Sequence, residues 1–222
     1  MITKKQLLQG MNLALKNARR LLKEANILYQ RKAYSRAFVL AVLALEEAGK
    51  VVFLTLCFSE ERFEAPERII KRFWRLYSSH TAKVAFFEDY NGSKWKSVLY
   101  VRKRKHEETR KFFQKVVKPL MRAIKDVYTY LEKVGISSIG ELKLKCLYVD
   151  VSESDLNFKL PYDIPPKVAK GMILIAENQI SDTSTLRDFF RRAKTGRLSD
   201  DILAITVRDQ EIRQILDELS QR

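Results

Sequence analysis

The first thirty residues of the chain place an apolar side chain at every third or fourth position. The members of this row are Leu7, Met11, Ala14, Ala18, Leu21, Ala25 and Leu28. Because an α-helix turns once in about 3.6 residues, the spacing predicts an amphipathic helix of about eight turns. Thr3 and Gln6 have the spacing of a capping box, which predicts that the helix begins there. A helix of this length buries its apolar face best along other long helices, so the spacing favours a helical bundle.

A second helix is predicted from about Tyr34 to Phe58. It is apolar on nearly every side, which predicts the central, most buried helix of the bundle. Pro66 suits the first turn of a third helix. A fourth long helix is expected from Trp95 to near Gly135, and Pro119 should kink it or divide it in two, because proline breaks the helical hydrogen-bond ladder.

The pattern changes after residue 135. Apolar and polar residues alternate over 142–149, which predicts an extended segment or a small hairpin. Residues 152–166 contain three prolines and three acidic residues, as loops do. Shorter helices are then expected at about residues 167–179, 184–194 and 208–219.

The sequence therefore predicts a mostly α protein. Only 7 glycines and 5 prolines interrupt its 222 residues, which suits long helices better than a β protein with many turns. Two regions are expected. Residues 1–135 would form a bundle of long antiparallel helices. Residues 136–222 would form a C-terminal extension packed on the bundle, with an irregular or extended segment near 140–160 and short helices.

Positive charge is concentrated in the first two thirds of the chain. The formal net charge is +15, and residues 1–150 carry 31 basic and 15 acidic side chains. The densest run, residues 102–125, has ten basic residues against Glu107 and Glu108. Such a field favours a polyanionic partner, because binding releases counterions. The alternative is a solvated face that improves solubility.

The location predicted from the sequence is the cytoplasm. The longest apolar run, Ala37 to Leu45, is too short to span a bilayer, and the first residues lack the apolar core of a secretory signal. Two distant cysteines, Cys57 and Cys146, indicate buried free thiols in a reducing compartment. We expect no membrane association. Two histidines and two scattered cysteines also make a dedicated metal site unexpected, and no cofactor motif is present.

Two segments interrupt the apolar pattern with polar chemistry. In the segment 73–80, four residues separate Arg75 from His80, one of only two histidines. In the segment 43–50, Glu46, Glu47 and Lys50 stand in an otherwise apolar helix. Charges on a buried helix must be paired or must line a functional surface.

These two segments resemble HEPN domains, and more closely the AbiV family of abortive-infection proteins. A tyrosine, valine and aspartate at 148–150 are also similar to a segment of that family. The resemblance covers roughly residues 5–150. It implies a bacterial antiphage protein with a HEPN-like bundle that acts as a homodimer. Such a protein halts growth or translation when a phage-encoded protein activates it.

In HEPN ribonucleases an arginine and a histidine at this spacing form the catalytic pair. The resemblance therefore implies that Arg75 and His80 cleave RNA without a metal ion. Histidine titrates near neutral pH and can move a proton, and arginine forms paired hydrogen bonds to phosphate. On a regular helix the two side chains would lie ~140° apart, so two copies of the motif facing each other at a dimer interface would form the site. Alternatively, both residues are structural and pair with Glu46 or Glu47.

Two further groups of residues have expected supporting roles. Glu46, Glu47, Lys50 and Lys83 would hold the catalytic pair in place, or the first three would form an internal ionic network. The basic run would bind the phosphates of tRNA, rRNA or mRNA through Arg102, Lys103, Arg104, Lys105, Arg110 and Lys111. His106, inside that run, is expected on a solvated face.

One residue departs from the family pattern. A polar residue commonly follows the arginine in active HEPN ribonucleases, whereas Leu76 stands here. Two functions therefore remain open. The first is a metal-independent endoribonuclease. The second is a non-catalytic module that binds RNA, ribosomes or a phage protein and blocks translation by occupancy.

Overall fold

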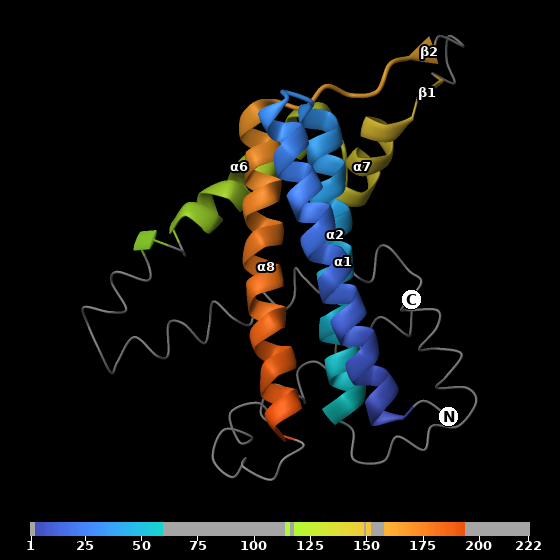
Figure 1. The fold of residues 1–222 in the computed structure, drawn as a ribbon. Helices are drawn as coiled ribbons and strands as arrows, with labels where there is room; N and C mark the ends of the chain where they lie inside the picture. The colour runs from blue at the N-terminus through green and yellow to red at the C-terminus, as the bar shows by residue number, and fades with distance from the viewer. Residues whose placement is uncertain (1–2, 60–113, 116–117, 149, 152–157, 194–222) are drawn as a thin grey trace. The chain divides into compact units, whose positions relative to one another are not determined.

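A computed structural model of the 222-residue chain describes residues 3–59, 114–115, 118–148, 150–151 and 158–193. The contacts divide the chain into two compact units, Met1–Arg187 and Asp188–Arg222. Across the described ranges the protein has five helices and one pair of very short strands (Figure 1), so it is mostly helical, as predicted. None of these helices combines the length and the apolar character that a membrane crossing requires.

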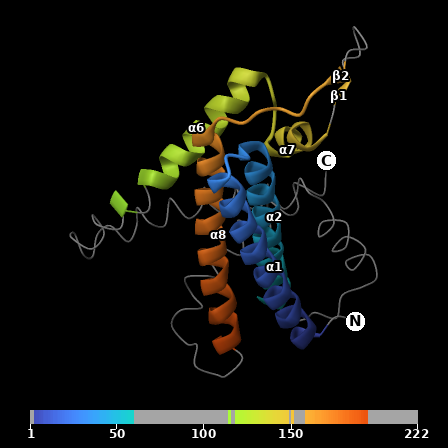
Figure 2. The ribbon, with the colours of Figure 1, turned by 45° about the horizontal axis from the view of Figure 1, so that its top comes forward.

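The first two helices form a hairpin. Helix α1 spans Lys4–Gln30 and helix α2 spans Tyr34–Ser59, close to the predicted bounds. The capping box is present: the Gln6 amide donates to the Thr3 hydroxyl, and the Thr3 amide donates to the Gln6 side-chain oxygen. At the other end Lys32 adopts a left-handed φ of 62°, which turns the chain between the helices. The two helices then run side by side (Figures 1 and 2).

Helix α2 is central, as its composition predicts. Its fully buried side chains recur on several faces of the helix rather than on one stripe. They include the consecutive residues Ala37, Phe38 and Val39, and also Ala44 and Leu45. On α1 only one face is buried, and Leu7, Met11, Ala14 and Ala18 from the predicted row lie on it. Helix α1 therefore packs its apolar stripe on α2, and other elements also cover α2.

Helix α6 spans Lys118–Val134 and has Pro119 as its second residue. Proline is tolerated there because the first amides of a helix have no intrahelical partner. Gly135, with a φ of 66°, ends the helix, and the Ile136 amide donates to the Leu131 carbonyl. Residues 116–117 lie outside the described residues, so the expected kink or division at Pro119 stays a prediction. The predicted third helix and residues 95–113 of the fourth lie outside the described residues.

The predicted extended segment over 142–149 is wrong, because most of it is helical. Helix α7 spans Ile139–Leu147, and the Ser138 side chain caps it by accepting from the Glu141 amide. The buried residues follow a helical phase at Ile139, Leu142, Lys143 and Cys146. An alternating pattern of eight residues fits a helix buried on one side as well as it fits a strand.

Among the described residues, the β structure lies in the predicted region and is very small. Strand β1, Asp150–Val151, pairs antiparallel with strand β2, Phe158–Lys159. The register places Asp150 opposite Lys159. Beyond β2 the Ile164 amide donates to the Ser35 hydroxyl, and the Tyr130 hydroxyl donates to the Asp163 carbonyl. These contacts fasten the connection to α2 and α6.

The predicted short helices at 167–179 and 184–194 are one helix. Helix α8 spans Pro166–Ala193, beginning at a proline as helices often do. The hydroxyl-rich stretch 181–185 favours a break, because such side chains compete for backbone groups. Here they bond back along the helix instead: Thr183 donates to the Gln179 carbonyl and Ser184 to the Ile180 carbonyl. The hydroxyls are thus satisfied without ending the helix.

Helix α8 contacts α1 and α6. Arg19 donates to the Ser184 hydroxyl and Arg187 donates to the Asn12 side-chain oxygen, each at 2.8 Å. Gly171 lies against Ala123 of α6. The region after residue 135 therefore contacts the first helices directly, whereas the predicted domain boundary at residue 135 stays a prediction. The predicted helix at 208–219 lies outside the described residues.

We expect Gly171→Ala to lower the free energy of unfolding by ~1–3 kcal/mol, because it overfills a helix crossing. A methyl group at Gly171 would lie 3.2 Å from the Ala123 carbonyl oxygen and 3.5 Å from its Cα, and backbone atoms cannot move aside. Gly140→Ala is the matched control, since only the Ser138 hydroxyl lies near, at 3.9 Å. It should be neutral or stabilise by up to ~1 kcal/mol through helix propensity. Urea unfolding measures both, and equal stabilities would contradict a tight crossing.

Candidate functional site

Glu46, Glu47 and Lys50 lie in the interior of α2. Helical geometry separates the two carboxylates by ~100° around the axis, so they have different surroundings. The Glu46 side chain is only 3% exposed, whereas those of Glu47 and Lys50 are each 18% exposed. The charged segment is thus buried on one side and partly accessible on the other.

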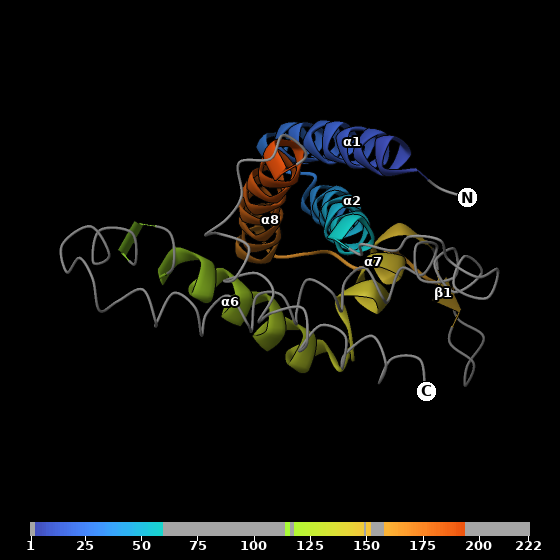
Figure 3. The same cartoon turned by 90° about the horizontal axis from the view of Figure 1, so that it is seen from below.

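Glu46 is paired with Lys143 of α7. The Lys143 ammonium donates to the Glu46 carboxylate at 2.6 Å, and the lysine side chain is 7% exposed. The two residues stand 97 positions apart in the sequence. An unpaired charge at either position would be costly to bury, so each requires the other. The pair therefore joins α7 to the central helix, and α7 also packs on α2 (Figure 3).

Lys143 is the residue that sequence reasoning missed. The extended segment that the alternation predicts around it gives no reason to expect a buried lysine. The available signal is helical phase: position 143 belongs to the same buried face as Leu142 and Cys146. A lysine on the buried face of a helix needs an acidic partner, and Glu46 is the more deeply buried of the two carboxylates on α2.

Glu47 forms a second ion pair, with Lys50, one helical turn away at 2.5 Å. This is the predicted intrahelical pairing. Neither Glu46 nor Lys50 is limited to these partners, because both take part in further interactions. The charged segment of α2 thus has the character of an ionic network.

The catalytic and phosphate-binding residues predicted from the sequence lie outside the described residues. They are Arg75, His80, Lys83, Arg102, Lys103, Arg104, Lys105, Arg110 and Lys111. Of the predicted site, the structure therefore describes Glu46, Glu47 and Lys50. The proposal that these three position Arg75 and His80 stays a prediction, and so does the alternative in which all of them are structural.

The described residues contain one free cysteine, Cys146. Burial, and to a smaller extent the carboxylate of Asp163, raises the pKa of this thiol to about 12. The group is therefore protonated at neutral pH and is a poor nucleophile. Within the same residues, no three histidine, cysteine, aspartate or glutamate side chains gather as metal ligands would.

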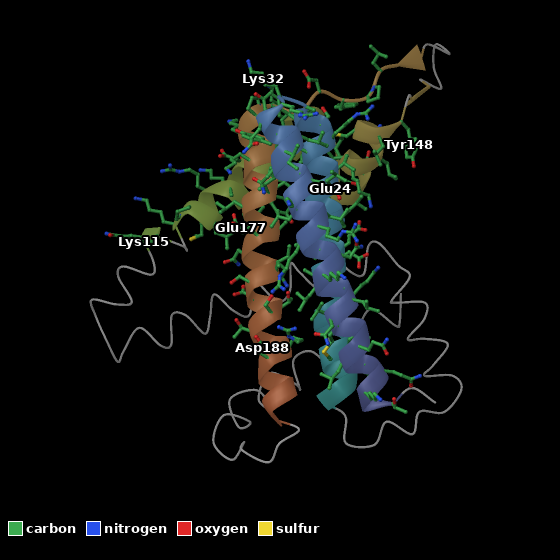
Figure 4. The ribbon with its side chains drawn as sticks, in the orientation of Figure 1. Glu24, Lys32, Lys115, Tyr148, Glu177 and Asp188 are labelled. Atoms are coloured by element: carbon green, nitrogen blue, oxygen red, sulfur yellow. The ribbon has the colours of Figure 1, made fainter. Side chains whose placement is uncertain are left out.

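The segment at 148–150 lies at the end of α7 and the start of β1. The Tyr148 side chain is 63% exposed (Figure 4), and Asp150 forms part of the short strand pair. Asp150 therefore takes part in backbone pairing opposite Lys159. No catalytic role was predicted for this segment.

The fold and the site define a class of protein: a mostly helical bundle whose central helix carries an ionic segment. The sequence profile of the AbiV family, a family of HEPN domains, matches residues 6–181. The chain therefore belongs to the AbiV family. No curated protein and no solved structure matches it.

Proposed function

We propose that the protein is an abortive-infection effector that stops growth or translation in a phage-infected bacterium by cutting RNA without a metal ion. The supporting observation is that the chain belongs to the AbiV family of HEPN domains and carries Arg75 and His80 within the matched residues. Four residues separate the pair, as in the HEPN ribonucleases that the motif resembles. We further propose that the protein acts in the cytoplasm and that a phage protein is its activator.

The proposed reaction is attack of a ribose 2′-hydroxyl on the adjacent phosphorus. His80 takes the proton from this hydroxyl, the new oxygen–phosphorus bond forms, and the bond to the 5′-oxygen breaks. A protonated imidazole returns a proton to the leaving oxygen. Arg75 binds the phosphate oxygens, where its planar fork stabilises the charge that develops in the transition state. The products are a 2′,3′-cyclic phosphate and a free 5′-hydroxyl.

The ionic segment of α2 would support this site. Glu46 and Lys143 anchor α2 to α7 from within the core, so the orientation of the central helix is restrained. Glu47 and Lys50 are partly exposed on the same segment and can restrain a neighbouring side chain. In this proposal they position the reacting groups and do not touch the RNA.

We expect the protein to form a two-fold dimer in solution. The physical reason is that side chains ~140° apart on a regular helix do not converge, whereas two copies facing across an axis can combine an arginine and a histidine from each. Light scattering at tens of micromolar should give twice the monomer mass. A monomer would argue against a composite site and would weaken the ribonuclease proposal.

One observation favours a second function. Leu76 follows the arginine, where active HEPN ribonucleases commonly have a polar residue. In this alternative the protein binds RNA, ribosomes or a phage protein and blocks translation without cleaving anything.

A cleavage assay separates the two functions. Purified protein is incubated with total RNA in excess EDTA, and wild type is compared with His80→Ala. The ribonuclease proposal expects fragments with 2′,3′-cyclic phosphate ends from wild type only. Intact RNA with wild-type protein that still arrests growth would support blocking by occupancy.

A further inference from the structure

Helix α6 has a buried apolar face and an exposed face that carries positive charge. Its buried residues are Leu120, Ala123, Val127 and Leu131. On the opposite side the exposed residues include Lys118, Arg122 and Lys125. At ~100° per residue these three cations fall within about 60° of one another around the axis, roughly opposite the buried face. We call them the α6 cation row.

The α6 cation row is available to a partner. Within the part of the chain that the structure describes, no carboxylate pairs with Lys118, Arg122 or Lys125. The nearest acidic residue on one flank, Asp126, lies 4.0 Å from the Lys167 ammonium of α8, so its charge is partly balanced. Glu132 is on the same face about two turns beyond Lys125, which marks the end of the row.

A further cation extends the row in the other direction. Lys115 is exposed in the short described segment that precedes α6, and its side chain extends away from the neighbouring helices (Figure 4). At about 1.5 Å per residue the α6 cation row alone is ~10 Å long. A straight row of unpaired cations matches a phosphodiester strand, whose charges also form a line, better than it matches a single small anion.

Large side chains with apolar surface lie along one flank of the row. Met121 is 53% exposed and Tyr128 is 37% exposed, and the two are seven residues apart on α6. The faces of such side chains can stack against unpaired bases, which are accessible in single-stranded RNA and hidden in a duplex. Cations beside a stacking surface form the usual arrangement for binding a single strand.

We propose that this face of α6 binds single-stranded RNA. Lys118, Arg122 and Lys125 hold successive phosphates, and Met121 and Tyr128 contact the bases. The inference rests on the proposed function, because it assigns part of the RNA-binding surface of the same effector. It assigns this role to the end of the basic run 102–125 that lies on α6, beyond the six phosphate-binding residues at 102–111 named from the sequence.

The test compares two charge reversals of equal size in a His80→Ala protein, which prevents cleavage during the measurement. One variant changes Lys118, Arg122 and Lys125 to glutamate. The control changes Lys16, Arg20 and Lys23, which are exposed on α1, to glutamate. Fluorescence anisotropy measures the affinity for a labelled single-stranded oligoribonucleotide at several salt concentrations, and circular dichroism checks the fold.

We expect the α6 variant to bind at least about tenfold more weakly than the control at low salt. The slope of log affinity against log salt should fall by about 2, because each single-strand phosphate contact contributes roughly 0.7. Replacing the three residues by glutamine should act in the same direction and serves if the reversal does not fold. Tyr128→Ala should weaken binding about tenfold with the slope unchanged.

Each other outcome has a distinct meaning. If the His80→Ala protein with an unchanged α6 binds no RNA, the proposed function itself fails. If it binds RNA but the α6 and control reversals have equal effects, only net charge matters and the inference is overturned. If growth arrest in the His80-containing protein needs the α6 row while RNA binding does not, the partner is an acidic protein and the RNA assignment is wrong.

Discussion

A His80→Ala protein should no longer arrest growth or cleave RNA, while its fold and its dimer remain intact. Loss of a general acid and base costs typically 10²–10⁴-fold in rate. His80 is expected to show the full effect because, of the two histidines, it is the one in the motif that resembles the catalytic pair of HEPN ribonucleases. His106→Ala is the matched control and should retain nearly all activity. Growth arrest on induction and cleavage of total RNA in EDTA measure the outcome.

Substitutions at Arg75 should separate charge from geometry. Arg75→Ala should lose activity as His80→Ala does. Arg75→Lys should restore little, because lysine keeps the positive charge but loses the planar fork that binds two phosphate oxygens. A folded, dimeric His80→Ala protein that still arrests growth would decide against acid–base catalysis by this motif. In that case binding would be the toxic act, as the departure at Leu76 allows.

The second large effect should come from the buried ion pair. Lys143→Met should lower the free energy of unfolding by ~3–5 kcal/mol, because it leaves the Glu46 carboxylate buried without its lysine. In a Glu46→Gln background the same change should cost much less. The difference, a coupling energy of about 2 kcal/mol, measures the pair itself. Urea unfolding of the four proteins gives this value.

A surface pair provides the control for this experiment. Lys167 lies 4.0 Å from Asp126 and its side chain is 70% exposed, so Lys167→Met should change the unfolding free energy by no more than ~1 kcal/mol. Similar losses at Lys143 and Lys167 would mean that the buried pair does not hold α7 on α2. An equal cost of Lys143→Met with and without Glu46 would assign the effect to packing instead.

The ion pair also connects stability with the proposed activity. If Lys143 holds α7 on α2, the Lys143→Met protein should cause weaker growth arrest than wild type even under conditions in which it remains folded. His80→Ala should instead leave the unfolding curve unchanged. This contrast separates a positioning residue from a catalytic one.

The sequence by itself determined the features that depend on local spacing. Apolar residues at every third or fourth position predicted α1, and the capping residues Thr3 and Gln6 predicted where it begins. Apolar residues on nearly every side of α2 predicted that this helix is central. Pro119 lies in the first turn of α6, a position that proline's own backbone favours. Membership of the AbiV family was also predictable, since short motifs are local.

Only the tertiary structure decided which distant side chains meet. The partner of Glu46 lies 97 residues away. Helical phase places Lys143 on a buried face, but no local pattern shows which acidic residue it meets. The alternation of apolar and polar residues at 142–149 is compatible with a strand and with a helix. Because α7 packs on α2, most of this segment is helical. The stretch 181–185 favoured a break by its composition, yet its hydroxyls bond within α8 and the helix continues along α1. Local propensity is weak, about a kcal/mol or less per residue, so burial against other helices overrides it.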